Sequence, residues 1–350
     1  MTAGQLFFEQ ACSPSLALAR GAALTKVLTQ EQPIALYGTS FSGVSGEDAV
    51  VLGSYQLASQ TLVHGSHGQV LRRNSGGTAV RAGEGIGYVA LALHDRASMM
   101  SCPPGRLLNR NVRGVLQGLR LLGARANYFG RDFLSFGAQP AVFAAWDAGL
   151  DGSVLLEFFI AHTRSCFIPD TELAYPPRRE PALRGQTPTT LAAVQVSATA
   201  AQCFEAIAEG HSKGFGVAWQ RADLAALAPH QSELASSTDT SAERALHWSS
   251  PHEEAIGFVS AGVALDGSGK IAAVRVAGDF LAHRACAVTL DRVLIGVTPT
   301  PELVGRAVDA AFAPHANSGH DVEGIRNLRT FQDAIIDAAD AAAKVSSVLS

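Results

Sequence analysis

Residues 71–80 read LRRNSGGTAV, two arginines followed by a small, flexible turn and the start of an apolar strand. Glycine lets backbone N–H groups approach a bound molecule closely, and a guanidinium group pairs well with phosphate or carboxylate. The same pattern also fits an ordinary hairpin turn whose arginines face solvent. On the residues alone, an anion site and a plain turn are supported about equally.

Short apolar runs bounded by Gly or Ser surround this stretch, and they predict strands at 33–37, 49–53 and 88–93. We expect these three strands to lie in one sheet. Between Val112 and Leu122 the apolar residues recur at three- and four-residue steps, which predicts a helix with one buried face. The N-terminal part of the chain should therefore mix strands and helices.

The chain changes character after residue 224. Residues 225–253 are polar and rich in turn-forming types, which predicts a linker between a domain at 1–224 and a second domain at 254–350. We find no internal repeat.

The second domain contains a clear hairpin pattern. Apolar runs at 256–265 and 271–276 flank the turn sequence DGSGK at 266–270, whose Asp-Gly and Ser-Gly pairs tolerate positive φ. Two helices are expected after it, one at 301–312 and one with Ile325, Leu328, Phe331 and Ile335 on a single face.

Composition narrows the class of protein. The 350 residues are 47% apolar and 17% charged, which fits a folded chain of two domains with a sizeable core. A formal net charge of −4 gives no general attraction to nucleic acid or to an anionic membrane, so neither is expected as a partner. The first residues lack a secretion signal and no run of about 18 apolar residues occurs, so we expect a cytoplasmic protein.

Cysteine and histidine side chains are the candidates for reactive or metal-binding groups. Five widely spaced cysteines without a C-x-x-C pair favour reduced thiols. Cys166, with Arg164 close by, and Cys102 are candidate nucleophiles, although a buried or incidental thiol is favoured. His64 and His67 have no third ligand near them in the sequence, so no metal site is predicted.

Residues 71–80 resemble the R-R-x-S-G-G-G-A-V signature of the lipoate-protein ligases, members of the biotin/lipoate ligase superfamily, with Thr78 replacing one glycine. Three further segments resemble family motifs and occur in the family's order. They are VLGSYQ at 51–56 for V-I-G-R-x-Q, GRDFL at 130–134 for G-R-N-D-L, and GSVLL at 152–156 for the G-T-L-L-L strand. After the linker, GKI at 269–271 and VAGDFL at 276–281 resemble the G-x-I and G-D-F-F pattern of the small accessory domain.

The resemblance implies an α+β fold, in which a mixed-sheet biotin/lipoate ligase-like domain at 1–224 is followed by a small α+β C-terminal accessory domain at 254–350. It also implies activation of lipoate or a related medium-chain acyl group with ATP and Mg²⁺, and transfer to a lysine of a lipoyl carrier domain. The expected substrate-binding residues are Arg72, Arg73, Asn74, Ser75, Gly76, Gly77, Thr78 and Asp132.

Within that set, the resemblance assigns Arg72 and Arg73 to the adenylate phosphate, and residues 75–77 to backbone contacts with the ligand. It assigns Arg131 and Asp132 to the nucleotide side of the pocket.

One departure from the family bears on catalysis. These ligases place a lysine in a G-R-K-x-x-G segment, where a point cation stabilises negative charge in a dry pocket. The matching segment here is GAQPAV at 137–142, with Gln139 in the expected place, and no lysine occurs between Arg72 and Leu156. Gln139 is therefore expected to face the acyl carbonyl, and Arg131 is the candidate replacement cation. An equally supported alternative is that Arg131 pairs with Asp132 or faces solvent.

Three other family positions also differ, and here they are Ser54, Ala82 and Asp151. Two functional hypotheses follow. The first is a divergent lipoate-protein ligase, and the second is a non-catalytic descendant that binds an acyl group, a nucleotide or a protein partner.

Overall fold

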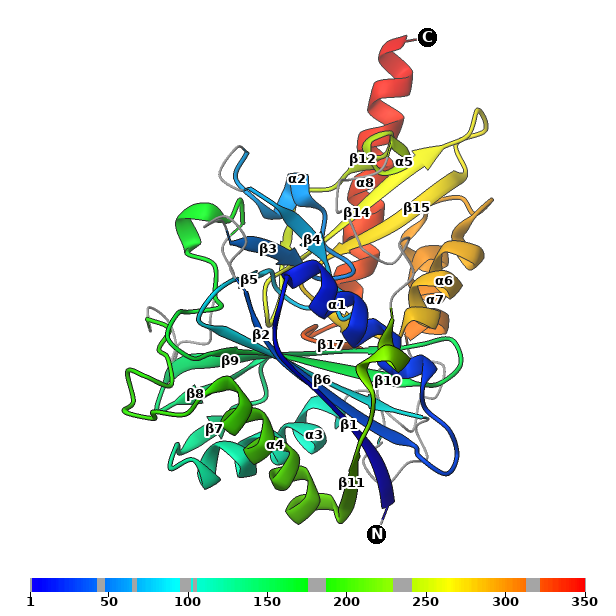
Figure 1. The fold of residues 1–350 in the computed structure, drawn as a ribbon. Helices are drawn as coiled ribbons and strands as arrows, with labels where there is room; N and C mark the ends of the chain where they lie inside the picture. Colours follow the sequence, from blue (N-terminus) through cyan, green and yellow to red (C-terminus); the bar gives the residue numbers. More distant parts are fainter. Residues whose placement is uncertain are drawn as a thin grey trace.

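An eight-stranded mixed sheet forms the centre of the computed structural model (Figure 1). The structure describes residues 2–42, 48–64, 68–94, 102, 106–175, 187–228, 241–312 and 322–349. The strand order is β11-β1-β2-β6-β10-β9-β8-β7, in which β1 runs parallel to β2 and β11 and the other pairs are antiparallel. The strands are β1 (Thr2–Cys12), β2 (Ile34–Phe41), β6 (Ile86–Leu93), β7 (Ala126–Tyr128), β8 (Phe133–Phe136), β9 (Gln139–Ala148), β10 (Val154–Ala161) and β11 (Val217–Arg221).

Helices α3 (Leu107–Leu121) and α4 (Ala200–Phe215) cover one face of this sheet, and α1 (Pro14–Ala23) lies on the other (Figure 1). The helix expected at 112–122 is confirmed as the greater part of α3. Glycines let α3 and α4 approach closely, because a Cβ on Gly210 would lie 2.2 Å from the carbonyl oxygen of Gly114.

A separate three-stranded sheet, in the order β4-β3-β5, lies beside the central one. It consists of β3 (Ala49–Leu52), β4 (Val70–Arg72) and β5 (Val80–Ala82), with the short helix α2 (Ala58–Thr61) following β3. The prediction that 49–53 shares a sheet with 33–37 and 88–93 was therefore wrong. Val50 and Leu52 face a small core of their own while Val51 faces the main core, so β3 is apolar on both faces. Such a run does not reveal which sheet it joins.

The hairpin expected around 266–270 is confirmed as β14 (Phe258–Leu265) paired with β15 (Ile271–Gly278). The Asp266 carboxylate stabilises its turn by accepting the backbone N–H groups of Ser268 and Lys270 at 2.8 and 3.0 Å. The interval 225–253, predicted as a linker, also contributes β12 (His247–Trp248) and β13 (His252–Glu253), which both pair with β14.

The remaining C-terminal elements pack around this hairpin. The helix expected at 301–312 is confirmed as α7 (Pro301–Phe312). The last helix, α8, begins only at Arg329, so Ile325 and Leu328 precede it instead of sharing its face. The other elements of this part are α6 (Arg284–Leu294), β16 (Leu281–Ala282), β17 (Val322–Glu323) and α8 (Arg329–Leu349).

Short elements join these layers: η1 (Leu24–Lys26), η3 (Asp170–Glu172), η4 (Leu224–Leu227) and α5 (Ser241–Arg244). The C-terminal elements have a hydrophobic core separate from that of the central sheet. Tyr55 also belongs to this C-terminal core, although it lies far from the other core residues in the sequence. The division into two domains and its boundaries stay a prediction. Within the described residues, no helix is long and apolar enough to cross a membrane.

Candidate active site

Arg73 is the centre of the loop at 73–78, and it is 2% exposed. Its Nη1 donates to the carbonyl oxygen of Val51 at 3.1 Å, its Nη2 to those of Thr78 at 2.8 Å and of Gly76, and its Nε to the Ser75 hydroxyl at 3.1 Å. Burial lowers the pKa of Arg73 to about 10, so it remains charged near neutral pH. Its hydrogen bonds go to the protein itself, to the loop and to Val51 of β3.

A buried carboxylate completes this arrangement from the central sheet. Glu157 on β10 is 1% exposed, and it accepts the backbone N–H of Ser75 at 2.9 Å and the Tyr88 hydroxyl at 2.6 Å. The field of Glu157 favours the charged form of Arg73, against the cost of burial. Arg73 and Glu157, both buried, thus each hold the loop through their own hydrogen bonds.

The glycines of the loop face the C-terminal part of the chain. The backbone N–H of Gly77 donates to the carbonyl oxygen of Phe280 at 2.9 Å. A Cβ on Gly76 would lie 2.2 Å from that same oxygen, which is closer than real Cβ contacts allow. The close approach that these glycines permit is therefore made by protein backbone, where the sequence led us to expect a ligand.

Arg72 and Asn74 differ from their buried neighbours. The half-buried Arg72 side chain donates to the carbonyl oxygens of Gly53 at 3.2 Å and of Gln56, which fastens the loop to the residues after β3. Asn74 is exposed. The phosphate contacts expected of Arg72 and Arg73 stay a prediction, and both guanidinium groups donate to backbone carbonyl oxygens, and that of Arg73 also to the Ser75 hydroxyl.

Two of the motif segments meet at a buried hydrogen bond. The Gln56 side chain accepts the backbone N–H of Gly53 at 2.8 Å and donates to Asp279 Oδ1 at 2.5 Å. Asp279 is 4% exposed, and burial raises the pKa of its carboxyl to about 7. The GSYQ segment after β3 and the GDFL segment after β15 are thereby tied together.

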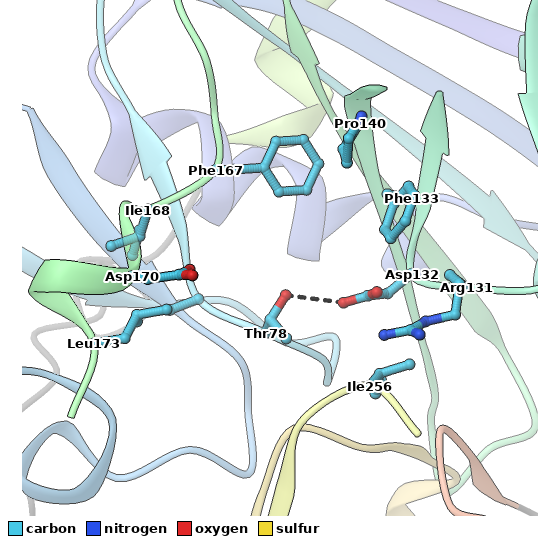
Figure 2. Close-up of a pocket in the computed structure, with 11 residues that line it drawn as sticks. Thr78, Arg131, Asp132, Phe133, Pro140, Phe167, Ile168, Asp170, Leu173 and Ile256 are labelled. Atoms are coloured by element: carbon cyan, nitrogen blue, oxygen red, sulfur yellow. Dashed lines mark hydrogen bonds between the residues drawn. The ribbon is translucent and has the colours of Figure 1, made fainter. Parts of the chain in front are cut away.

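A small pocket opens beside this loop, at Thr78 (Figure 2). The Thr78 hydroxyl donates to Asp132 Oδ2 at 2.8 Å, and of the pocket's described lining residues Arg131 is the one with a positive charge. Its volume is about 40 Å³, so it must open to admit an acyl chain or a nucleotide. The lining residues are Thr78, Ala79, Arg131, Asp132, Phe133, Pro140, Phe167, Ile168, Asp170, Leu173 and Ile256.

The structure therefore brings together only three of the expected site residues in the pocket, namely Thr78, Arg131 and Asp132. Gln139, at the start of β9, is exposed and donates to the carbonyl oxygen of Thr187 at 3.3 Å, although its neighbour Pro140 lines the pocket. The Asp132 carboxylate is bonded to Thr78, and the Arg131 guanidinium carbon lies 6.0 Å from the centre of the Phe133 ring.

Sequence reasoning did not indicate that two further parts of the chain form the pocket wall. Ile168, Asp170 and Leu173 come from the segment after β10, and Ile256 comes from the C-terminal part of the chain. In the sequence, the apolar pair Phe167-Ile168 next to Cys166 is a signal for this part of the wall.

Cys166 lacks the environment of a nucleophile. It is fully buried, its thiol donates to the carbonyl oxygen of Phe159 at 3.4 Å, and burial raises its pKa to about 12. A thiolate is therefore disfavoured at Cys166. Four of the five cysteines are buried and Cys102 is half-buried, and all five are free thiols.

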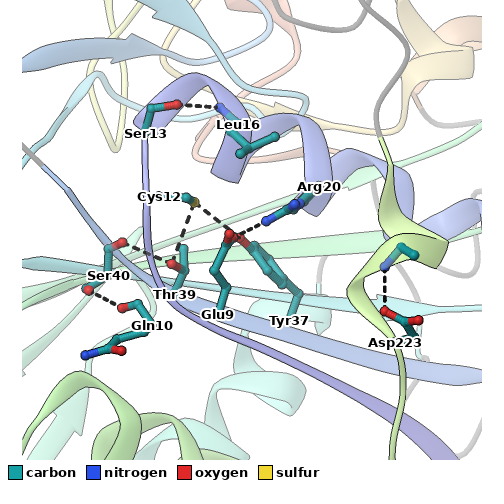
Figure 3. A network of polar contacts seen from close by, with 11 residues as sticks. Glu9, Gln10, Cys12, Ser13, Leu16, Arg20, Tyr37, Thr39, Ser40 and Asp223 are labelled. Carbon is teal, nitrogen blue, oxygen red and sulfur yellow. Dashed lines mark hydrogen bonds and ion pairs between the residues drawn. The ribbon is translucent and has the colours of Figure 1, made fainter. Parts of the chain in front are cut away.

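A second enclosed polar cluster lies between β1, β2 and α1 (Figure 3). Arg20 of α1 pairs with Glu9 of β1, and Glu9 accepts the Tyr37 hydroxyl of β2 at 3.0 Å. The Cys12 thiol lies 3.5 Å from the Tyr37 hydroxyl, and burial raises the pKa of that thiol. These contacts fix α1 to the sheet, which accounts for the cluster without a ligand.

The chemistry of the pocket agrees with the groups that the resemblance implies. Carboxylate oxygens, as on Asp132 and Asp170, are ligands that Mg²⁺ prefers, and the guanidinium of Arg131 suits a phosphate. Within the described residues no group of three His, Cys, Asp or Glu side chains is placed to hold a metal ion. His67, one of the two histidines considered above, lies outside the described residues.

Comparison with solved structures establishes the fold. The chain is similar over 99% of its length to P. falciparum LipL1, crystallised in complex with lipoate, covering 99% of that chain with a TM-score of 0.62 and 12% identity. Weaker similarity, at a TM-score of 0.48 and 17% identity, links 70% of the chain to 89% of a bipartite lipoate protein ligase from Thermoplasma acidophilum. The structure of a lipoate-protein ligase A bound with ATP is similar at a TM-score of 0.49 and 15% identity. This similarity covers 69% of this chain and 91% of that one.

No protein-family model matches the sequence, and no curated protein does. The chain nevertheless has the biotin/lipoate ligase fold, as predicted, and the similarity to LipL1 extends over its N-terminal and C-terminal parts alike.

Proposed function

We propose that this protein is a divergent lipoate-protein ligase, which binds lipoate or a related medium-chain acyl group at the pocket around Thr78 and Asp132. The observation that carries the proposal is the whole-length similarity in fold to a ligase crystallised with lipoate. An apolar wall of Phe133, Phe167 and Ile168 beside a polar end suits a ligand with an alkyl chain and a charged group.

In this proposal Arg131 faces the developing negative charge, and Asp132 orients the polar end of the site through Thr78. ATP would convert the acyl carboxylate to an acyl-adenylate with release of pyrophosphate, and a lysine of a lipoyl carrier domain would take the acyl group with release of AMP. Asp132 and Asp170 are the carboxylates that could hold Mg²⁺ beside the phosphates. Since Gln139 carries no charge, the reaction is slow. Losing one preorganised donor to a transition state costs roughly a hundredfold to a thousandfold in rate.

The test is a gel-shift assay for lipoylation of a carrier domain with ATP, which compares the wild type with Gln139→Lys and Arg131→Ala. We expect slow transfer by the wild type, a gain of roughly a hundredfold in Gln139→Lys, and loss of transfer in Arg131→Ala. Gln220→Lys, which adds a lysine at an exposed position of β11, is the matched control and should leave the rate unchanged. Wild-type transfer at ordinary ligase rates would refute the claim that the lysine matters here.

The second hypothesis is a non-catalytic protein that retains a ligand of the same kind. The exposed position of Gln139 and its hydrogen bond to Thr187 favour it, because a group at the edge of the pocket contributes little to catalysis. Binding of lipoate or octanoate, seen as a rise in melting temperature, without transfer by either the wild type or Gln139→Lys would support this hypothesis over the first.

A further inference from the structure

The pocket at Thr78 has a polar end and an apolar end, and an aromatic side chain closes the apolar one. Figure 2 shows Phe167 and Pro140 at the end of the pocket that lies away from Thr78 and Arg131. A carboxylate is attracted to the guanidinium group of Arg131. An acyl chain bound with its carboxylate toward Arg131 therefore extends toward the ring of Phe167.

Two aromatic rings meet at this closed end. The rings of Phe133 and Phe167 pack edge to face, with their centres 6.2 Å apart and their planes at 89°. Phe133 is 4% exposed and Pro140 is buried, whereas Phe167 is half-buried. Of these three side chains, Phe167 is therefore the one whose ring borders solvent and can turn without displacing the core.

The backbone at Phe167 is held in place by its neighbours. Phe167 forms an antiparallel bridge with Val80 of β5, and the carbonyl oxygen of Cys166 accepts the backbone N–H of Arg81 at 2.7 Å. The backbone N–H of Phe167 itself donates to the Ser165 hydroxyl at 3.1 Å. Because these contacts oppose a movement of the backbone, this end of the pocket opens by rotation of the Phe167 side chain.

This way of opening favours one shape of ligand over another. The enclosed volume of about 40 Å³ is smaller than an acyl chain, so the Phe167 ring has to turn for any such ligand. A linear saturated chain is narrow and adjusts about its single bonds. The five-membered dithiolane ring of lipoate is wider and rigid, so it displaces the Phe167 ring further and disrupts its contact with Phe133.

We propose that Phe167 is a specificity-determining residue of the acyl site, and that it makes the pocket select a linear medium-chain acyl group over lipoate. This inference rests on the proposed function, and it narrows the class of substrate at that same site. Phe133 acts with Phe167 as the fixed half of the closed end, since β8 pairs it with Phe143 of β9.

The test is calorimetric binding of octanoate and of lipoate, whose chains have the same number of carbon atoms. We expect the wild type to bind octanoate roughly tenfold more tightly than lipoate, which is the size of effect that steric misfit in an apolar pocket produces. Phe167→Ala removes the ring and should bring the two affinities to equality or reverse their order. Phe167→Leu keeps an apolar but flexible side chain, and it should give an intermediate ratio even if the alanine variant fails to fold.

Two further variants separate selectivity from general effects. Phe129→Ala is the matched control, because Phe129 is 57% exposed and is not among the described residues that line the pocket. It should leave both affinities unchanged. Thr78→Val, at the polar end, should weaken the binding of both acids alike and so preserve their ratio.

Binding of lipoate by the wild type as tightly as octanoate, or more tightly, would overturn the inference. So would a wild-type ratio of affinities in folded Phe167→Ala and Phe167→Leu. In both cases the acids still bind, so the proposed function stands and only the role of Phe167 is rejected. If neither acid binds to the wild type or to any variant, the proposed acyl site is rejected together with the inference.

Discussion

The loop at 73–78 meets the pocket at Thr78, yet these two regions of the molecule keep the family pattern to different degrees. Residues 72–77 keep both arginines and two of the three glycines of the motif, and contacts with Val51, Glu157 and Phe280 hold this stretch in place. The pocket side has Thr78 for a glycine and Gln139 for the lysine. Where protein backbone closes on a residue, its identity is fixed by packing, whereas a pocket wall tolerates exchange.

The comparison shows that the best-matching motif is evidence for the fold more than for the reaction. Arg73 donates to three carbonyl oxygens of its own surroundings, and the glycines admit the backbone of Phe280. These contacts are needed whether or not a ligand is ever bound. The reaction has to be tested at the pocket residues.

The largest effect is expected from Arg73→Met. It removes the donors to the carbonyl oxygens of Val51, Gly76 and Thr78 and leaves these acceptors unsatisfied, so we expect a loss of about 3–5 kcal/mol in the free energy of unfolding. Urea unfolding followed by circular dichroism measures it. Arg120→Met, at an exposed site on α3, should stay within about 0.5 kcal/mol of the wild type. Equal stability of the two variants would mean that Arg73 is not a structural residue.

The stability contributed by Asp279, at the junction between the loop and the C-terminal part, should depend on pH. Burial raises the pKa of Asp279 from its ordinary 3.8 to about 7, so the folded protein holds a proton that the unfolded chain has lost between these values. The contribution to stability is complete below about pH 4 and is lost as pH rises through 7, by about 2–4 kcal/mol.

Asp279→Asn should remove that slope and, because its amide oxygen can still accept from Gln56, raise stability at pH 8 relative to the wild type. The measurement is the free energy of unfolding from pH 4 to 8 for both proteins. Parallel curves would show that Asp279 titrates normally in the folded protein.

Gly76→Val should cost about 1–3 kcal/mol, because its side chain would collide with the backbone at Phe280. The matched control is Gly214→Val near the end of α4, where a Cβ would meet nothing within 4 Å. A melting temperature lowered only in Gly76→Val would support packing as the reason for the glycine. Equal melting temperatures, with lipoate binding lost in Gly76→Val alone, would instead favour the ligand contact expected from the sequence.

Local patterns predicted the elements correctly where short-range physics determines them. The turn at Asp266 is stabilised by the Asp266 side chain, which accepts hydrogen bonds from nearby backbone N–H groups. The apolar face of α3 follows from the spacing of its apolar residues in the sequence. The sheet membership of β3 was not predictable, because both of its faces are buried by elements distant in the chain. Ile256 in the pocket wall is a similar case, since only the docking of the C-terminal part brings it there.

The site residues divide along the same line. A family motif marks Thr78, Arg131 and Asp132, and the structure places these three residues in one pocket, while their roles stay a prediction. The role of Gln139 depends on where its side chain points, which no motif specifies, and it lies exposed beside Pro140. The partners of Arg73 could not be predicted either, because Val51 and Glu157 come from other strands.

The smallest change in stability, and the most informative about function, is expected from Thr78→Val. This substitution keeps the volume of the side chain but removes its hydrogen bond to Asp132, which should cost about 1 kcal/mol in the free energy of unfolding. If the pocket binds the polar end of an acyl ligand, the rise in melting temperature caused by lipoate or octanoate should fall sharply in the variant, because Asp132 loses the partner that orients it. Thr298→Val, at an exposed position outside the pocket, controls for the change of side chain alone. An unchanged response to the ligand in Thr78→Val, together with a lost response in Gly76→Val, would reverse the contrast drawn between the two regions: the loop would then be the binding element and the pocket a packing defect beside it.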